Sequence, residues 1–198
     1  MSVRIAAPAE RGFTLIELVV GILVFAIAMV ALVNVFAPQI RKGIDPIWQV
    51  RAVTLAQSLS SEIRAKSFDE NTQFANVGGP CGSSQACTQS GSLGPDVGET
   101  RPFFDDVDDF HGLVLQGSDI ANSLGLTTDF SGVDVYSGFS VSISVFYDDN
   151  EDGINDDDLD NNGTLDSGVL IGTRKLVQIT VQTPSGENMV FAMFRNNY

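Results

Sequence analysis

The chain has 198 residues, which is enough for one compact domain with a hydrophobic core and an anchor segment, and too few for a typical two-domain enzyme. Its 25 acidic and 11 basic side chains give a formal net charge of -14, and most of the acids lie in the last two-thirds of the sequence. Such a surface repels a phosphate backbone, so we expect no nucleic-acid partner.

An uninterrupted apolar stretch covers residues 18–37 and follows a short basic leader. It is long enough to cross the hydrocarbon core of a bilayer as a helix, and Asn34 is its only strongly polar side chain. The basic leader favours a cytoplasmic N-terminus. A secretory signal peptide cleaved after Ala37 is the alternative, although Pro38 would then directly follow the cut.

A second helical pattern follows the apolar stretch. Apolar residues recur at spacings of three and four from Ile44 to Ile63, and polar residues occupy the other positions, which predicts an amphipathic helix. Pro38 and Pro46 each remove an amide donor and crowd the preceding turn. We therefore expect the long helix to be kinked or locally melted at these two prolines.

The middle of the chain, residues 66–137, is rich in Gly, Ser, Asn and Asp and shows no lasting periodicity. It therefore predicts a long connecting region. Cys81 and Cys87 enclose a Gly- and Ser-rich run, which indicates a small disulfide loop in an oxidising compartment. A pair of free thiols is the alternative, and two cysteines are too few for a typical four-ligand zinc site.

Three later segments alternate apolar and other residues with period two: 141–147, 177–182 and 189–194. This alternation predicts strands, and residues 183–187 supply a turn between the last two. The predicted fold class is α+β. A long N-terminal helix, first transmembrane and then amphipathic, packs on a small C-terminal antiparallel sheet.

The sequence GFTLIELV at residues 12–19 opens the apolar stretch and places Glu17 at its edge. A carboxylate near hydrocarbon is costly, so Glu17 requires a partner, and the span itself contains no cation. For an isolated helix, the alternative is that Glu17 lies at the level of the lipid headgroups.

This string resembles the class III signal of type IV pilins and pseudopilins. In that family a membrane aspartate peptidase cleaves after the glycine and methylates the new N-terminal phenylalanine. The resemblance implies that Gly12 precedes the cut, that Phe13 becomes the methylated terminus, and that Glu17 neutralises the Phe13 amine of a neighbouring subunit. The spacing of four places both charged groups on one helix face. When they pair between neighbouring subunits, neither charge is buried in hydrocarbon without a counter-charge.

The resemblance implies three segments: a cleaved leader at 1–12, a transmembrane and polymerisation helix at 13–42, and an extracytoplasmic pilin domain at 43–198. The implied partners are other pilin subunits, the prepilin peptidase, the inner-membrane pilus assembly machinery and membrane lipid. The implied location is the bacterial inner membrane, as a single-pass protein with a periplasmic C-terminus, before assembly. After assembly it is the extracellular pilus.

A narrower resemblance covers residues 44–51, 67–71 and 105–112, which are similar to the MshD minor pilins of the mannose-sensitive haemagglutinin (MSHA) pilus. It implies a low-abundance subunit for fibre initiation or surface display. A minor pseudopilin of a type II secretion system and a tip-displayed adhesin are the alternatives. No nucleophile elbow, phosphate loop or metal-hydrolase pattern occurs, and we expect His111, the only histidine, to be a surface loop residue. We therefore predict a non-enzyme.

Residues 148–166 are strongly acidic and contain neither Lys nor Arg. Two runs, ten residues apart, start like calcium loops, with oxygen-bearing side chains at alternate positions and then a glycine. Neither completes an EF-hand, because Leu159 and Val169 stand where a bidentate Glu is needed. We expect at least one Ca²⁺ here, and a solvated acidic loop is the alternative. The candidate ligands are Asp148, Asn150, Asp152, Asp156, Asp158, Asp160, Asn162 and Asp166.

Overall fold

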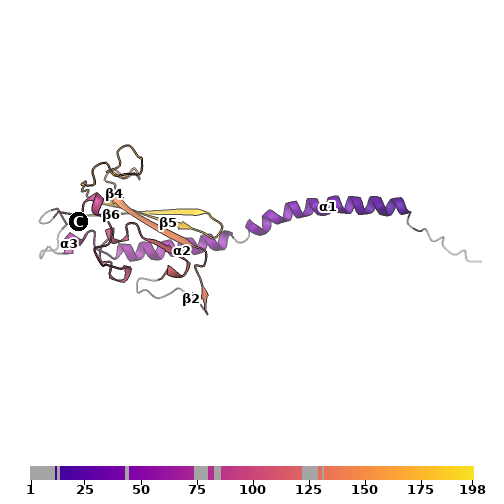
Figure 1. Ribbon diagram of the computed structural model, residues 1–198, viewed down its shortest axis with the longest axis horizontal. Coiled ribbons are helices and arrows are strands. Elements are labelled where there is room, and N and C mark those ends of the chain that lie inside the picture. The colour runs from indigo at the N-terminus through magenta and orange to yellow at the C-terminus, as the bar shows by residue number, and fades with distance from the viewer. Residues whose placement is uncertain are drawn as a thin grey trace, which may run out of the picture. The chain divides into compact units, whose positions relative to one another are not determined.

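The computed structural model describes residues 12, 14–42, 45–73, 80–82, 86–121, 129–130 and 132–198 (Figure 1). The chain divides into two compact units, Met1–Pro46 and Ile47–Tyr198.

The first unit contains α1, a helix of 28 residues from Leu15 to Lys42. Thr14 precedes it in the manner of an N-cap, because its Oγ1 accepts a hydrogen bond from the Glu17 amide at 3.4 Å. The backbone stays helical through Pro38, so the helix is not melted there, and the alternative, a kink at Pro38, stays a prediction. A single proline removes only one donor, and the helix continues on both sides of it.

Helix α2 spans Asp45–Arg64. Pro46 lies in its first turn, where the amide donor that proline lacks would have had no helical partner. One face of α2 is buried, as the spacing predicted, and it includes Ala52, Leu55 and Leu59. Arg195 closes the other end by donating hydrogen bonds to the carbonyl oxygens of Arg64 at 3.1 Å and Lys66 at 2.6 Å.

Among the residues that the structure describes, four antiparallel strands form the main sheet in the order β1-β4-β5-β6. Their bounds are Val114–Gln116, Ser140–Tyr147, Arg174–Gln182 and Asn188–Asn196. The three longer strands confirm the predicted ones. Alternate residues of β4 and β5 face the core in register, with Ile143 opposite Ile179. A two-stranded hairpin, β2 (Asp129–Phe130) and β3 (Val133–Asp134), forms a separate sheet.

The core lies between α2 and the sheet, which run alongside each other in Figure 1. The connecting region also contributes to it, because Phe104, Val107, Phe110 and Ile120 are buried in the same cluster. The described residues of this region include β1, the short helix α3 (Glu70–Gln73) and four 3-10 turns. Those turns are η1 (Ser90–Ser92), η2 (Arg101–Phe103), η3 (Asp108–Phe110) and η4 (Gly117–Asp119). A strand of three residues is too short to show a period, which is why the sequence pattern missed β1.

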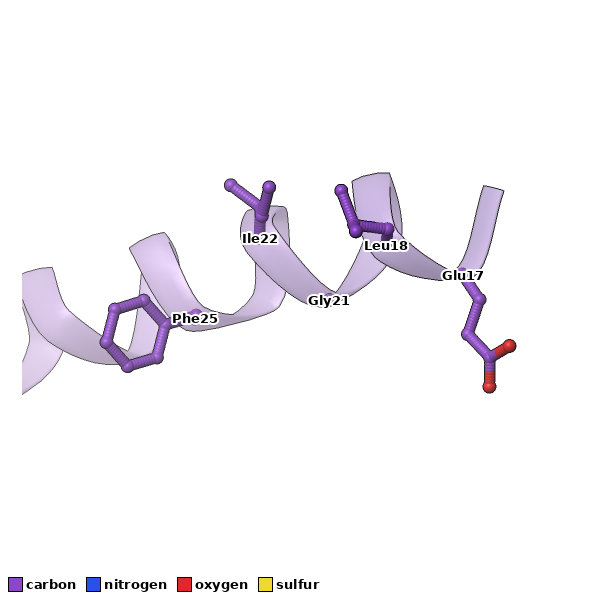
Figure 2. A pocket seen from close by; sticks show the side chains of 5 residues that line it. All are labelled: Glu17, Leu18, Gly21, Ile22 and Phe25. Carbon is purple, nitrogen blue, oxygen red and sulfur yellow. The ribbon is translucent and has the colours of Figure 1, made fainter. Parts of the chain in front are cut away.

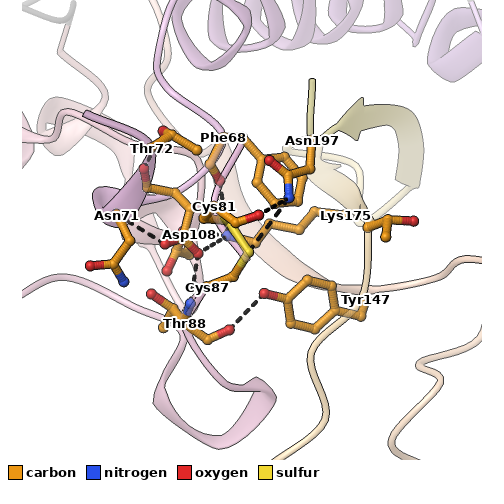
Figure 3. Close-up of a disulfide and its surroundings, with 12 residues drawn as sticks. Phe68, Asn71, Thr72, Cys81, Cys87, Thr88, Asp108, Tyr147, Lys175 and Asn197 are labelled. Atoms are coloured by element: carbon orange, nitrogen blue, oxygen red, sulfur yellow. Dashed lines mark hydrogen bonds and ion pairs between the residues drawn. A yellow bond between two sulfur atoms is a disulfide. The ribbon is translucent and has the colours of Figure 1, made fainter. Parts of the chain in front are cut away.

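The predicted disulfide between Cys81 and Cys87 is confirmed, with the two Cα atoms 5.1 Å apart. Both cysteines are buried in a second small cluster with Phe68 and Tyr147 (Figure 3). Asn197 Nδ2 donates a hydrogen bond to the Cys81 carbonyl oxygen at 3.0 Å. The disulfide loop is therefore tied to the segment that follows β6.

Candidate functional site

The start of α1 carries the predicted processing and assembly residues. Gly12 is exposed, and Phe13 lies outside the residues that the structure describes. Glu17 lies in the first turn of α1, and its carboxylate extends away from the helix (Figure 2). Within the described part of the chain, this carboxylate has no hydrogen-bonding or ionic partner.

The 20-residue segment Leu15–Asn34 contains a window of 18 residues with a mean hydropathy of 2.9, and none of that window is buried. It is long and apolar enough to cross a membrane. A groove of about 390 Å³ runs along its first turns and is lined by Glu17, Leu18, Gly21, Ile22 and Phe25 (Figure 2). Gly21 leaves the groove open, because no atom lies within 4 Å of the position that a Cβ would occupy. A neighbouring helix could therefore approach α1 closely at this point.

The first acidic loop, residues 148–156, is organised around a buried carboxylate. Asp148 is 0 % exposed, and its Oδ1 and Oδ2 accept hydrogen bonds from the amides of Asp152 at 3.1 Å and Gly153 at 2.9 Å. Gly153 has a φ of 82°, a left-handed conformation that glycine adopts readily. Asp156 Oδ2 closes the loop by accepting a hydrogen bond from the Asp149 amide at 2.7 Å.

The second acidic loop, residues 158–166, repeats this arrangement ten residues later. The Asp158 carboxylate accepts hydrogen bonds from the amides of Asn162 at 2.9 Å and Gly163 at 2.8 Å. Gly163 has a φ of 83°. Asp166 Oδ2 accepts a hydrogen bond from the Leu159 amide at 2.7 Å. Each loop therefore folds around its first Asp and is closed by its last.

The donor chemistry of both loops fits a hard cation such as Ca²⁺, which prefers carboxylate and carbonyl oxygens. A carboxylate oxygen that accepts one amide hydrogen bond keeps acceptor capacity for a cation. Hydrogen bonds link Asn150 to Asp152 in the first loop and Asp160 to Asn162 in the second. Among the described residues, the three predicted aspartate ligands of each loop do not bring carboxylate oxygens within 4.8 Å of one another, so the full predicted ligand sets are not gathered around one point. A cavity of about 170 Å³ lies at the loops, and Asn150, Asp152, Asp156 and Asp158 are among the residues that line it.

A buried ion cluster, which the sequence did not predict, lies inside the second unit (Figure 3). Lys175 on β5 is 0 % exposed. Its Nζ lies 2.6 Å from Asp108 Oδ1 and 3.0 Å from Asp69 Oδ2, and it donates to the Phe68 carbonyl oxygen at 2.9 Å. One signal could have revealed it, because Lys175 shares the inward phase of Val177 and the apolar residues that follow on the same strand.

The aspartates of this cluster differ in protonation. Burial, followed by repulsion from Asp108 and a side-chain hydrogen bond with it, raises the pKa of Asp106 to about 9. Burial alone would also raise the pKa of Asp69, but the charge of Lys175 and two backbone amides outweigh it and lower that pKa. At neutral pH, Asp106 is therefore a neutral acid and Asp69 is an anion.

His111 occupies an exposed turn after η3, as expected for a surface loop residue. Its Nδ1 accepts a hydrogen bond from the Val145 amide at 3.1 Å. The histidine thus has a structural contact with β4.

Comparison with known families finds that residues 8–33 match the model described as the prokaryotic N-terminal methylation motif. Gly12, Phe13 and Glu17 all lie within the matched segment. No curated protein and no solved structure matches the chain. The chain therefore carries a type IV pilin-like methylation signal at the head of an exposed apolar helix, and its small antiparallel sheet completes a pilin-like α+β fold.

Proposed function

We propose that the protein is a minor type IV pilin of the MSHA type, which polymerises through α1 and takes part in assembling or displaying an extracellular fibre. The observation that carries the proposal is Glu17. It lies within a methylation motif, on a helix whose apolar surface is exposed, and it has no partner among the described residues. The exposed apolar surface of such a helix is covered by contacts with other molecules.

The chemistry of assembly follows from this unpartnered carboxylate. Cleavage after Gly12 would create a positively charged amine at Phe13, one helical step of four from Glu17. In hydrocarbon, neither charge is solvated by water, so an amine from one subunit and Glu17 of the next stabilise each other. The pairing sets the axial offset between neighbouring helices, and the groove at Gly21 allows them to approach closely.

Processing also defines the partners and the location. The motif implies cleavage by the prepilin peptidase and assembly with other pilins. Before assembly, α1 anchors the protein in the inner membrane with the second unit in the periplasm, and afterwards the subunit lies in the fibre. The MSHA-type role is supported by the resemblance of residues 44–51, 67–71 and 105–112 to MshD minor pilins.

The test is the mass of the mature chain recovered from membranes. We expect it to begin at a methylated Phe13, and Gly12→Val should block cleavage because a bulky side chain then occupies the position before the cut. Gly21→Ala is the matched control, since it changes a glycine beyond the cleavage site, and it should be processed normally. A mature chain that begins at Pro38 would instead support a secretory signal peptide.

A pseudopilin of a type II secretion system is the first alternative, and it would share the same N-terminus. Recovery of the protein from sheared surface fibres supports the pilus. A secretion defect on deletion, with no protein in surface fibres, supports the pseudopilus.

A tip-displayed adhesin is the second alternative, and one observation favours it. A largely polar cavity of about 530 Å³ lies where β1, β4 and β5 meet, and it is lined by residues that include Gln116, Asp134, Ser140 and Gln182. Hydroxyl, amide and carboxylate groups of this kind form hydrogen bonds with sugars. Binding of the full-length chain to a glycan array, lost in Gln116→Ala, would support the adhesin function.

We also propose that the two acidic loops bind Ca²⁺. The supporting observation is that the two loops repeat the same hydrogen bonds around Asp148 and Asp158. Two such loops in tandem, each with four candidate oxygen ligands, concentrate negative charge that a divalent cation would neutralise.

Titration calorimetry on the detergent-solubilised full chain tests this proposal. Asp148→Ala and Asp158→Ala should each remove one of two binding events, and Asp119→Ala, at an exposed acid outside the loops, should remove none. If the wild type shows no heat of Ca²⁺ binding, the solvated acidic loop is the correct interpretation.

A further inference from the structure

The cluster around Lys175 has the composition of a condensation site rather than of a simple ion pair. One amine and one carboxylate lie in contact, with Lys175 Nζ 2.6 Å from Asp108 Oδ1. A second carboxylate, Asp69, lies 3.0 Å from the same nitrogen. A third, Asp106, forms a side-chain hydrogen bond with Asp108. The lysine and the three aspartates are all at most 3 % exposed.

The surroundings of the lysine are buried and partly aromatic (Figure 3). Its Nζ lies 4.5 Å from the centroid of the Phe68 ring and 5.6 Å from that of Tyr147. Burial in such an environment penalises charged species. An ion pair at this distance can convert to the neutral amine and the neutral acid when one proton moves between the two groups, and amide formation requires these neutral forms.

We propose that Lys175 and Asp108 condense to form an intramolecular isopeptide bond, which links β5 covalently to the 3-10 turn η3. Asp106 acts as the acid and Asp69 as the base. The product is an amide between Lys175 Nζ and Asp108 Cγ, and one water molecule is released.

The atoms balance without a further reactant. Lys175 passes one proton to Asp108, and the neutral amine then attacks Cγ, forming the N–C bond. Asp106 donates its hydrogen bond to the Asp108 carboxyl group, which stabilises the negative charge that develops there. Asp69 takes the second proton from the nitrogen and returns it to the leaving hydroxyl as the C–O bond breaks. Water leaves, and Asp69 and Asp106 recover their starting states.

Asp108, not Asp69, is the carboxyl group that reacts. Asp69 accepts hydrogen bonds from the amides of Asn71 at 3.1 Å and Thr88 at 2.8 Å, in addition to the lysine. These contacts stabilise its carboxylate form and make its carbon a poor electrophile. Asp108 instead lies beside a neutral acid, because burial and the repulsion of Asp108 raise the pKa of Asp106 to about 9.

The decisive experiment is the intact mass of the mature full-length chain, purified in detergent, reduced to open the disulfide and alkylated. We expect a mass lower than that of the mature sequence by one water molecule. Trypsin should then fail to cut after Lys175, and the fragment 175–195 should stay joined to the fragment that contains Asp108. A chain with the full sequence mass and free cleavage at Lys175 would overturn the proposal.

Variants separate the roles of the acids. Lys175→Arg keeps the positive charge and should restore the mass of an unlinked chain. Asp106→Asn keeps the shape of the side chain and leaves Lys175, Asp69 and Asp108 in place, so it should fold, as circular dichroism will show, and lack the bond. A folded Asp106→Asn chain that still loses water would exclude Asp106 as the acid. Lys66→Arg, at a lysine outside the cluster, is the matched control and should keep the bond.

Discussion

Glu17 and Lys175 are both charged side chains in an apolar environment, but they differ in whether the chain itself provides a partner. Glu17 stands on an exposed apolar helix and has no partner within the described chain. Lys175 is 0 % exposed, and its Nζ contacts two carboxylates and a carbonyl oxygen. A partner for Glu17 must come from another molecule, whereas Lys175 has its partners within its own fold.

The comparison separates assembly from stability. A substitution at Glu17 leaves every described side-chain contact of the second unit intact, so it should change association and not folding. A substitution at Lys175 leaves Asp69 and Asp108 buried without a counter-charge, so it should change folding first. Four predictions sharpen this comparison.

The largest effect is expected for Glu17→Ala. The variant should still insert into the membrane, because alanine is the better helix former, but its incorporation into fibres should fall to a small fraction of the wild-type level. Immunogold labelling of sheared fibres measures incorporation, and membrane fractionation is the control. Normal labelling would contradict the pairing of charges between subunits.

Lys175→Met should lower the free energy of unfolding by at least about 3–5 kcal/mol, since it leaves two buried carboxylates uncompensated and also removes the proposed bond to Asp108. Arg174→Met, at the neighbouring position, is the matched control. Its partner Glu151 has a side chain that is 57 % exposed, and Arg174 Nε also donates to Asn196 Oδ1 at 2.8 Å, so the loss should stay near about 1–2 kcal/mol. Denaturant unfolding followed by circular dichroism compares the two. Equal losses would show that the buried contacts contribute no more than a surface pair.

Calcium should stabilise the chain by mass action at the acidic loops. At a free concentration of about 100 times the dissociation constant, one site adds roughly 2.7 kcal/mol, which corresponds to a rise in Tm of about 5 to 10 °C. Asp148→Ala combined with Asp152→Ala should abolish the contribution of the first loop. Magnesium at equal ionic strength is the control, and an equal rise with magnesium would indicate charge screening alone.

The smallest effect concerns Glu70. Burial, then a hydrogen bond with Asp105 and repulsion by nearby acids, raises its pKa to about 7. A raised pKa means that the fold prefers the protonated acid, so this contribution is present at low pH and is lost as the pH rises through about 7. The Tm measured without calcium should fall between about pH 5 and about pH 8. The Tm of Glu70→Gln should fall less over this pH range. Identical pH profiles of the Tm in the variant and the wild type would refute the assignment of this pH dependence to Glu70.

The periodic parts of the fold could be predicted from the sequence. The spacing between Ile44 and Ile63 located the buried face of α2, and strict alternation located β4, β5 and β6. Strand β1 was missed, because three residues carry no period. The packing of Phe110 and Ile120 was missed for a related reason, since they belong to turns and are positioned by the tertiary fold.

The candidate sites divide in the same way. The methylation motif and the acidic loops are contiguous in sequence, so local patterns were sufficient to propose them. The cluster at Lys175 joins residues that are 106 and 67 positions apart along the chain, at Asp69 and Asp108. No local pattern encodes contacts between residues this far apart in sequence. The position of Lys175 on the inward phase of β5 could have indicated the need for a buried counter-charge, but it was not used.

The sheet order has a consequence for biogenesis. Strand β6 follows every other strand in the chain and covers one side of β5. If the second unit is exported as proposed, β5 stays an open edge until Asn188–Asn196 has crossed the membrane, and it offers unpaired backbone groups beside apolar side chains such as Val177. A stop codon after Gln182 would make this state permanent. Such a truncated chain should aggregate or be degraded in the periplasm even though its membrane helix and methylation signal are intact.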